Sequence, residues 1–564
     1  MISTRWPEAH HFALACSLLL LLTLSASAQV KQKVKILNSG QQPGHYLDWD
    51  GTPILPIGDS ATQGWMESGT NFNQNGYIDA LSSRGINVAM IWSYIGTNAA
   101  GQAADTRIGY DAPEIWPWQG STDTNTMDLT QLNQAYFDRM KSFVSYAESK
   151  GVLVLITVHD GGAKWRFDRH PFNTSKGNGP LTNAGQYVQL AHHDYTEMPT
   201  TFNPSWNHQQ KNQYFQERFA DKLITELEPY SNVIYEMFNE GEWYDHSDRR
   251  SHEEHFLRFF NNRTDALLMS NSGHIYGGYD PHLNSDVDIV SVHGGWTGQH
   301  SNFVNGFNET PAKSYFQSEP WPPEFNGTNM TMGTICQSAW EQALAGAGWV
   351  AQNDTSFGWD PNAGMAAQSA SRDAAYDNIG HVATFFNDLG VGFWDMAPDP
   401  TLASTGICLA KLGDEYLIYA QTGGTFSVDL SAALDKPVDV QWYNPRTGVL
   451  TNATPVIGSA ITPFTAPDSN DWVLLLSVTT VPEPGDADGD GFVGGDDLSI
   501  VMSNWGLSGA VRSLGDLDGN GFVGGSDYSE VLSHWGDGTP LETVPELATL
   551  GLLIGGLVLL NRHK

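Results

Sequence analysis

The feature that most constrains the fold is a regular alternation of short apolar runs with helical patterns between about residues 35 and 398. The apolar runs have the length and the β-branched or aromatic composition of buried strands. We count eight of them: Thr52–Gly58, Ile86–Tyr94, Val152–Asp160, Val233–Glu240, His274–Tyr279, Val287–His293, Ser314–Glu319 and Gly348–Asn353. The helical patterns between them include Tyr77–Arg84, Leu132–Ser149, Gln209–Glu228 and Glu253–Leu268. Eight strands that alternate with helices predict a (β/α)8 barrel, or TIM barrel, over residues 35–398.

Polar or aromatic side chains stand where these predicted strands end. In a barrel of parallel strands the catalytic groups lie at the carboxyl edge, so a carboxylate there is a candidate. The fourth predicted strand stops at Asn239-Glu240, and the seventh stops at Glu319. The other strand-end residues are Asp59, Trp92, His159, Asp160 and His293, and Trp243 follows shortly after Glu240. A simpler interpretation of Asn239-Glu240 is a helix N-terminus, with Asn as the cap and Glu facing the helix dipole.

Two glutamates at the ends of strands four and seven match the needs of retaining glycoside hydrolysis. One carboxyl protonates the leaving oxygen while the other attacks the anomeric carbon, with the two groups about 5–5.5 Å apart. Their environments must push the two pKa values in opposite directions. Asn239 would hydrogen-bond the sugar 2-hydroxyl. The alternatives are Glu242, Glu324 or Asp160 as a catalytic carboxylate, and metal ligation by His159 and His293. We expect Glu236, one layer below Glu240, to be a buried structural glutamate.

The order of these residues resembles the large clan of retaining (β/α)8 glycoside hydrolases. More narrowly, the segments HYLDWDGTPILPIGDSATQGW, SSRGINVAMIW and AGAGWVAQNDTSFGW are similar to the apiosidase-like glycosidases, over roughly Gly44–Val478. That resemblance implies Glu240 as the acid/base and Glu319 as the nucleophile. It also implies a sugar site lined by Asp59, Trp92, His159, Asp160, Asn239 and His293, to which we add Trp243.

Residues 399–480 carry a different pattern. Short alternating runs such as Glu415–Ala420 and Trp472–Val478 are separated by turn signals, which predicts a small antiparallel β-sandwich. The phrases QWYNPRTG and DWVLLLSV are similar to the collagen-binding-type domain that follows apiosidase-like barrels. We expect this domain to pack against the barrel and stabilise it, and direct carbohydrate or collagen binding is the alternative. Residues 481–484, which include Pro482 and Pro484, are typical of a linker.

Residues 485–537 contain two copies of one motif, GDADGDGFVGGDDLSIVMSNWG and GDLDGNGFVGGSDYSEVLSHWG. Each copy offers side-chain oxygens at loop positions 1, 3, 5 and 12, a glycine at position 6 and a carbonyl at position 7, which is the pattern that selects Ca²⁺. The expected ligands are Asp486, Asp488, Asp490, Phe492 and Asp497 in the first loop and Asp516, Asp518, Asn520, Phe522 and Asp527 in the second. Two such loops, each with a helix after it, resemble a dockerin, which implies a small α-helical module that docks on a cohesin-like partner. The alternative is that calcium only folds the module.

Both ends of the chain carry export signals. Residues 1–28 have the layout of a signal peptide, with an apolar run before Ala-Ser-Ala. Residues 541–564 combine an apolar run, Leu547–Leu560, with a basic end. That run is short for a permanent transmembrane helix but suits a transient one. The tail resembles a PEP-CTERM sorting signal, which implies an exosortase-type processing enzyme. We therefore expect an exported protein at the cell surface or in the extracellular matrix, transiently anchored in the membrane.

Composition excludes several classes of function. A formal net charge of −35 makes nucleic acid an unsuitable partner. Beyond the signal peptide only Cys336 and Cys408 remain, so a single bridge stays open and a cysteine-based zinc site is excluded. No Gly-x-Ser-x-Gly motif is present, which disfavours a serine esterase.

Taken together, these patterns predict an exported retaining glycoside hydrolase that cleaves plant or algal polysaccharide or its side chains. It needs no cofactor for catalysis and uses calcium structurally. The alternative, from another class, is an inactive barrel that serves as a surface adhesion or matrix-scaffold protein.

Overall fold

The computed structural model describes residues 31–60, 73–93, 115–121, 124–160, 170–173, 199–239, 246–272, 281–295, 299–321, 332–351, 370–479 and 484–538. The chain splits into two compact units, Met1–Ser477 and Val478–Lys564. Several predictions fall outside the described residues: the signal peptide (1–28), most of the linker, the tail (541–564), and Glu240, Glu242, Trp243 and Glu324. Over the described ranges, no helix has the length and the apolar character that a membrane crossing requires.

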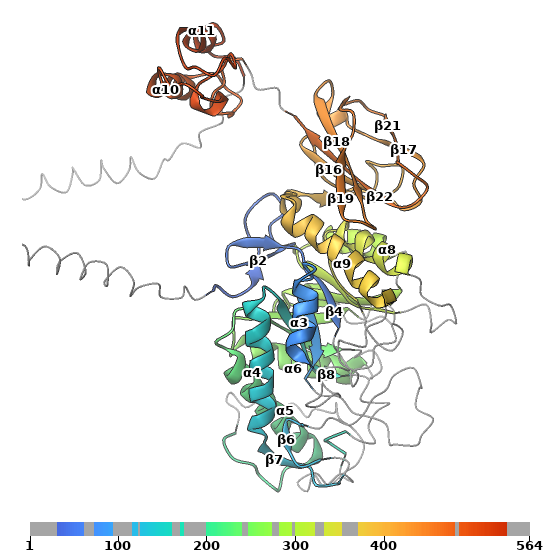
Figure 1. Cartoon of the computed structure of the whole chain (residues 1–564). Coiled ribbons are helices and arrows are strands. Elements are labelled where there is room, and N and C mark those ends of the chain that lie inside the picture. The colour runs from blue at the N-terminus through green and yellow to red at the C-terminus, as the bar shows by residue number, and fades with distance from the viewer. Residues whose placement is uncertain are drawn as a thin grey trace, which may run out of the picture. The chain divides into compact units, whose positions relative to one another are not determined.

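Eight parallel strands close into a barrel in the first unit, as the sequence predicted (Figure 1). In chain order they are β4 (Ile57–Ser60), β5 (Val88–Trp92), β8 (Leu153–Asp160), β9 (Val233–Asn239), β10 (Leu267–Ser272), β11 (Ile289–Gly295), β12 (Ser314–Trp321) and β13 (Gly348–Ala351). Each strand pairs in parallel with its chain neighbours, and β13 closes the ring against β4. β9 and β12 are therefore the fourth and seventh strands of the barrel, with β10 and β11 between them.

The prediction of the fifth strand was wrong. That strand, β10, lies at Leu267–Ser272 rather than at residues 274–279, and the helix before it, α6, spans His246–Asn261 instead of running to residue 268. Met269 of β10 pairs with Glu236 on one side and with Ile289 on the other. The residues Leu-Leu-Met suit a helix and a buried strand equally well. Only the pairing with two neighbouring strands shows that this segment is a strand. Residues 274–279 themselves lie outside the described ranges.

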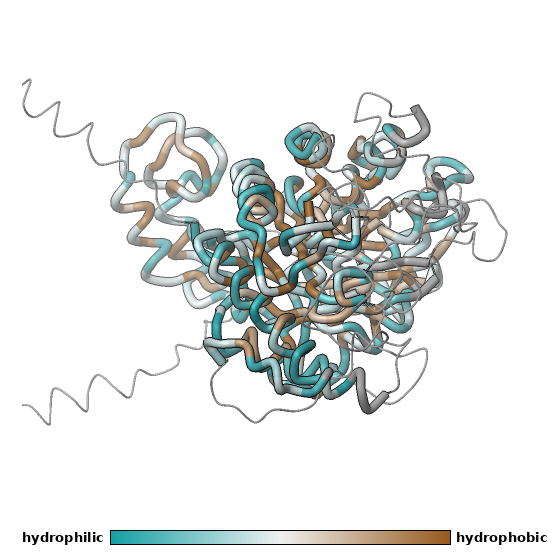
Figure 2. The backbone as a smooth tube through the Cα atoms, turned by 90° about the horizontal axis from the view of Figure 1, so that it is seen from below, coloured by the Kyte–Doolittle hydropathy of each residue, from teal (hydrophilic) through white to brown (hydrophobic). Residues whose placement is uncertain are grey.

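Helices cover the outside of the barrel. Besides α6 they are α3 (Gln74–Ser82), α4 (Gln134–Ser149), α5 (His208–Leu227), α7 (His300–Phe307), α8 (Met332–Ala343) and α9 (Ala370–Asp388). In α4, apolar side chains recur at helical spacing and are all buried: Tyr136, Phe137, Met140, Phe143, Val144 and Ala147. At the start of α5, Asn207 and Gln210 form a reciprocal capping box. Figure 2 shows the apolar stretches gathered towards the interior and the hydrophilic stretches around them.

A small antiparallel sheet of β1 (Lys35–Ile36), β2 (Leu47–Trp49) and β3 (Thr52–Ile54) contacts the amino-terminal side of β9. The backbone N–H of Val34 donates to the carbonyl of Ser231 at 2.8 Å, and the indole N–H of Trp49 donates to the Ser231 hydroxyl at 3.0 Å. Ser231 precedes β9, whereas Asn239 ends it. This sheet therefore lies at the end of β9 opposite to the predicted site.

An antiparallel β-sandwich-like region follows the barrel in the same unit. One sheet has the strand order β14-β15-β16-β22-β18-β19, with β20 paired to β18, and β17 pairs with β21. The strands are β14 (Ala397–Pro398), β15 (Cys408–Lys411), β16 (Glu415–Ala420), β17 (Thr425–Val428), β18 (Pro437–Asn444), β19 (Val449–Asn452), β20 (Val456–Ile457), β21 (Thr462–Thr465) and β22 (Trp472–Val478). β16 and β22 have the predicted bounds. Cys336 and Cys408 are both buried free thiols, so the bridge that the sequence left open is not formed.

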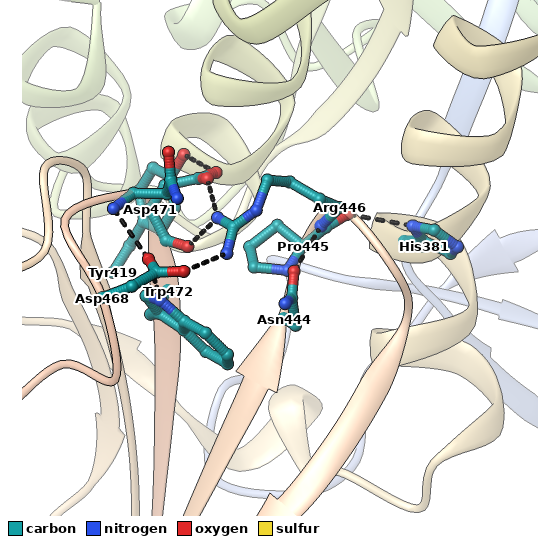
Figure 3. A network of polar contacts seen from close by, with 9 residues as sticks. His381, Tyr419, Asn444, Pro445, Arg446, Asp468, Asp471 and Trp472 are labelled. Atoms are coloured by element: carbon teal, nitrogen blue, oxygen red, sulfur yellow. Dashed lines mark hydrogen bonds and ion pairs between the residues drawn. The ribbon is translucent and has the colours of Figure 1, made fainter.

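Aromatic rings and main-chain carbonyls join the sandwich to helices α8 and α9. The Tyr443 hydroxyl donates to the carbonyl of His381 on α9 at 2.8 Å. Nδ1 of His381 lies 2.9 Å from the carbonyl of Pro445 (Figure 3). Trp340 of α8 lies with its ring 5.7 Å from that of Tyr443 and 6.1 Å from that of Tyr419. The expectation that the sandwich packs against the barrel is confirmed by these contacts.

Arg446 stabilises the turn of the sandwich that contains Pro445 and contacts α9. Its Nη1 donates to Asp471 Oδ1 at 2.6 Å, and its guanidinium carbon lies 5.2 Å from the ring centroid of Trp472. The indole N–H of Trp472 donates to Asp468 at 2.8 Å, and the Tyr419 hydroxyl donates to Asp471 Oδ2 at 3.0 Å. One cation thus links the turn to the strand β22 and, through Asp471, to β16.

The second unit holds the two copies of the repeat, each followed by one helix. These helices are α10 (Gly495–Ser503) and α11 (Gly525–Ser533). The buried apolar core of the unit is small and consists of Ala487, Val493, Val501, Ala510, Leu517, Val523 and Val531. Cores of this size rarely stabilise a domain without a metal, a disulfide or a partner.

Candidate active site and candidate calcium loops

Hydrogen bonds to the helix layer identify the strand residues that face outward. The Ser270 hydroxyl of β10 donates to Glu253 on α6 at 2.5 Å, so the adjacent Met269 and Asn271 face the barrel interior. Paired residues of neighbouring strands share a face of the sheet. Because Asn271 pairs with Ser291, the interior face of β11 is assigned in the same way.

Glu236 lies inside the barrel, near the middle of β9. It pairs with Met269, is fully buried, and accepts a hydrogen bond from the Thr157 hydroxyl of β8 at 2.6 Å. The prediction that Glu236 is a buried glutamate is confirmed. A buried carboxylate needs such a donor, because burying a polar group without one is unfavourable by roughly 1–3 kcal/mol.

Four of the predicted site residues lie near the carboxyl ends of the adjacent strands β5, β8 and β9. Asn239 ends the strand, is buried, and pairs with Asp160 of β8. His159 pairs with Phe238, one residue earlier. Trp92 ends β5, is buried, and pairs with Thr157. Glu240 follows Asn239 directly and lies outside the described residues, and only the backbone is described for Asp160.

The carboxyl end of β12 carries Glu319, of which the backbone is described. Glu319 pairs with His293 of β11, which is buried. The pairing of these two strands shifts by one residue between Ser291 and His293. At the shift, the hydroxyls of Ser291 and Ser318 lie 2.5 Å apart. Two predicted site residues, His293 and Glu319, are thus neighbours across a β-bulge.

Two of the predicted sugar-binding residues contact the helix layer instead. The Tyr77 hydroxyl of α3 donates to Asp59 Oδ2 at 2.8 Å, and Asp59 is buried. The ring of His159 lies 4.8 Å from that of His252 and 4.4 Å from that of Phe256, both on α6. These contacts give both side chains a role in packing, and their contact with a sugar stays a prediction.

Burial shifts the titration of this histidine group. Burial and the nearby His255 and His170 lower the pKa of His159 to about 3. Burial together with His159 and His255 lowers the pKa of His252 well below its usual value. Both rings are therefore neutral over the whole range in which most enzymes work.

In the second unit, three carboxylates of each repeat converge. Asp486, Asp488 and Asp497 each present an oxygen within 4.8 Å of the others, and so do Asp516, Asp518 and Asp527. These six are among the ten predicted calcium ligands. Asp490 and Asn520 instead accept hydrogen bonds at 2.8 Å from the backbone N–H of Phe492 and Phe522, respectively. The arrangement brings three of the predicted ligands of each loop together.

The donor set of these loops fits a hard cation. Carboxylate oxygens are the ligands that Ca²⁺ prefers. Oδ1 of Asp516 is buried and accepts no hydrogen bond. Burial and the negative charges of the neighbouring Asp497, Asp490 and Asp486 raise the pKa of Asp488. A bound cation would offset the repulsion between these carboxylates. Asp497 holds its loop closed, because its carboxylate accepts from the backbone N–H groups of Ala487 and Gly494, each at 2.7 Å.

Sequence reasoning missed the side chains behind the site. His252 and Phe256 on α6 pack against His159, and Ser291 and Ser318 bond across the bulge before Glu319. The spacing of His252 and Phe256, four residues apart, could have indicated one buried helix face. No local signal marks the serine pair, because the two residues belong to different strands.

Known structures share the fold of a large part of this chain. One, described as a glycoside hydrolase, is 15% identical, with a TM-score of 0.55 over 79% of this chain and 97% of the other. A glycoside hydrolase of family 5 from Bacteroides vulgatus is 14% identical, with a TM-score of 0.55 over 79% of this chain and 93% of the other. At this identity the likeness concerns the fold: a parallel eight-stranded barrel of the kind that glycoside hydrolases have.

A protein-family description also matches the sandwich. Residues 402–477 match the family described as "putative collagen-binding domain of a collagenase". This agrees with the resemblance that the sequence indicated for that region. No curated protein sequence matches the chain.

Proposed function

We propose that this chain is a retaining glycoside hydrolase in which Glu240 is the acid/base and Glu319 the nucleophile. The observation that carries the proposal is the strand order of the closed barrel. β9, which leads directly into Glu240, is the fourth strand, and β12, which carries Glu319, is the seventh. Glu240 and Glu319 thus belong to the carboxyl ends of two different strands. In barrel enzymes the catalytic residues lie at this edge of the barrel.

The chemistry follows the two-carboxylate scheme. The Glu240 carboxyl protonates the glycosidic oxygen while the Glu319 carboxylate attacks the anomeric carbon, and a covalent glycosyl-enzyme forms as the alcohol leaves. Glu240, now a carboxylate, then takes a proton from the water that attacks the same carbon, which releases Glu319. Asn239, beside Glu240 in the chain, would hydrogen-bond the sugar 2-hydroxyl.

We further propose plant or algal polysaccharide, or its side chains, as the substrate. The formal net charge of −35 favours neutral glycans over polyanionic ones, because like charges repel during encounter. Trp92 lies at the end of a barrel strand, where an indole ring suits a pyranose face. The sugar and the choice between endo and exo action depend on loops around the site.

The test compares single substitutions on a panel of aryl glycosides and polysaccharides. Glu240→Gln and Glu319→Gln should each lower kcat by at least about 10³-fold, because each removes a group that acts in the transition state. Glu254→Gln is the matched control, since Glu254 pairs with Arg250 on the surface of α6. Azide should restore turnover to Glu240→Ala. Full activity in either Gln variant would rule out the assignment, and inactivity of the wild type on every glycan would favour the scaffold alternative.

For the second unit we propose two calcium sites that hold the module together, as in a dockerin. The convergent carboxylates and the small core support this proposal. The bound cations would neutralise the convergent carboxylates and stabilise the closed loops. Trp505 and Trp535, at equivalent positions of the two repeats, are each about half exposed and favour docking of a cohesin-like partner.

Export to the cell surface or matrix completes the proposal. The signal peptide and the PEP-CTERM-like tail, with an exosortase-type enzyme that processes it, are the features that support this location. Mass spectrometry of the protein recovered from the cell surface tests it. The mature chain should begin near residue 29 and lack the apolar segment 547–560, and a chain that keeps both ends would contradict the proposal.

A further inference from the structure

The pairing of β11 and β12 contains one extra residue on β12. Up to Ser291 the register is regular, and Ser291 pairs with Phe316. From His293 onward the partners are Glu319, Pro320 and Trp321. Two residues of β12, Gln317 and Ser318, therefore face the single residue Val292 of β11, which defines a β-bulge.

This bulge determines whether position 319 lies on the inner or the outer face of the barrel. Side chains alternate along a strand, and Gln317 points outward because its side chain accepts from Ser338 of α8 at 3.3 Å. Regular alternation would then put residue 318 on the inner face and residue 319 on the outer face. The bulge instead pairs residue 319 with His293. His293 lies two residues after Ser291 on β11, so both positions are on the inner face.

One hydrogen bond spans the bulge. The hydroxyls of Ser291 and Ser318 lie 2.5 Å apart, and both residues are fully buried. Ser291 is the last residue paired in the first register, and Ser318 is the residue before the second register begins. In a buried environment such a bond is stronger than in water, so it favours the bulged pairing over the regular one.

We propose that Ser291 and Ser318 are positioning residues, whose hydrogen bond holds the bulge that brings the Glu319 position to the inner face of the barrel mouth. The inference rests on the proposed role of Glu319 as the nucleophile. Neither serine touches the substrate. They act through the backbone of β12, and a displacement of about 1 Å at a reacting group lowers rates by up to about 100-fold.

The experiment compares Ser291→Ala, Ser318→Ala and the double variant with Ser270→Ala. Ser270 is the matched control, because it is also a fully buried barrel serine whose hydroxyl makes a short bond, but it faces α6. With the aryl glycoside that the wild type turns over fastest, we expect kcat to fall about 10- to 100-fold in both test variants, with KM within about twofold. The double variant should lose no more than either single variant, because both remove the same bond. Ser270→Ala should lower the melting temperature by a similar amount and keep kcat within about twofold.

A second readout does not depend on activity. Hydrogen–deuterium exchange of peptides that cover Ser314–Trp321 should rise in Ser291→Ala and Ser318→Ala and stay unchanged in Ser270→Ala. Unchanged exchange and kcat in both test variants, or an equal loss of kcat in Ser270→Ala, would overturn the inference while leaving the proposed function intact. Activity that survives Glu319→Gln, together with faster exchange in the serine variants, would instead remove the proposed function and keep the bulge.

Discussion

The candidate barrel site and the candidate calcium loops bring their residues together in different ways. In the barrel, the residues that surround the proposed site come from strands that span Ile57 to Ala351, and their facing depends on strand pairing. In the second unit, the three carboxylates of each loop lie within 12 residues, and a turn of the backbone brings them together. The barrel rests on a large apolar core, whereas the second unit buries seven small or branched side chains. Long-range packing therefore determines one site, and local sequence with a proposed ion determines the other.

The largest expected difference between the two regions is their response to a chelator. Two calcium sites at 1,000 times their Kd would add about 8 kcal/mol, which is comparable to the whole stability of a small domain. We expect EDTA to unfold residues 484–538 and to leave the melting of the barrel unchanged, as followed by calorimetry of the full chain.

Substitutions within the loop sharpen this prediction. Asp497→Asn should lower calcium affinity strongly, because Asp497 belongs to the convergent carboxylates. Asp496→Asn, at the exposed neighbouring position, should leave affinity within about twofold. A module that melts at the same temperature with and without EDTA would contradict the contrast between the two regions.

Acid should act on the barrel through its buried histidines. His159 has a pKa of about 3 when folded and about 6.5 when unfolded, so the unfolded chain binds more protons between these values. Stability is therefore complete above pH 6.5 and falls as the pH decreases towards 3, by about 1.4 kcal/mol per pH unit for such a group. Urea unfolding at pH 7, 6, 5 and 4 measures this slope.

His252→Gln tests the effect of acid on the barrel, and His534→Gln is its control. His252 is fully buried, whereas His534 is partly exposed in the second unit. The first substitution should flatten the pH dependence of barrel unfolding, and the second should not. Identical slopes in the wild type and His252→Gln would show that the buried histidines contribute little.

A smaller effect is expected from the bond between Thr157 and Glu236. Thr157→Val keeps the shape of the side chain and removes the hydroxyl that donates to the buried carboxylate. The barrel should lose about 1–3 kcal/mol in urea unfolding, because a buried acceptor then loses its donor. Thr225→Val, at an exposed position on α5, should change stability by less than about 0.5 kcal/mol. An equal effect of the two substitutions would argue against a polar barrel interior that depends on paired groups.

The smallest effect should come from Arg446 at the junction of barrel and sandwich. Its side chain is one-third exposed, so the pair with Asp471 contributes at most about 1 kcal/mol. Arg446→Met should keep the aliphatic contact with Trp472 and lower the barrel melting temperature by only a few degrees. Arg250→Met, which breaks a more exposed pair with Glu254, should be neutral. Separate melting of the sandwich in Arg446→Met would show a weaker junction than the contacts indicate.

Much of the barrel could be predicted because its strands are apolar runs with recognisable ends. The order of β9 and β12 in the ring, the buried state of Glu236 and the bounds of β16 and β22 agree with the sequence. The fifth strand was misplaced because its apolar run continues a helical pattern without a clear break. Asp59 and His159 contact Tyr77 and α6, which no residue pattern around them indicates.

By itself, the sequence determined what neighbouring residues can specify: the number and kind of elements, the acidic residues at fixed spacing in the two repeats, and Glu319 near the end of the seventh strand. Only the tertiary structure decided which way the strand-end side chains face, where β10 lies, and that a bulge precedes Glu319. The physical reason is that facing and register arise from hydrogen bonds between strands far apart in the chain. A shift of one residue in that pairing exchanges the inner and outer faces without any change in local composition.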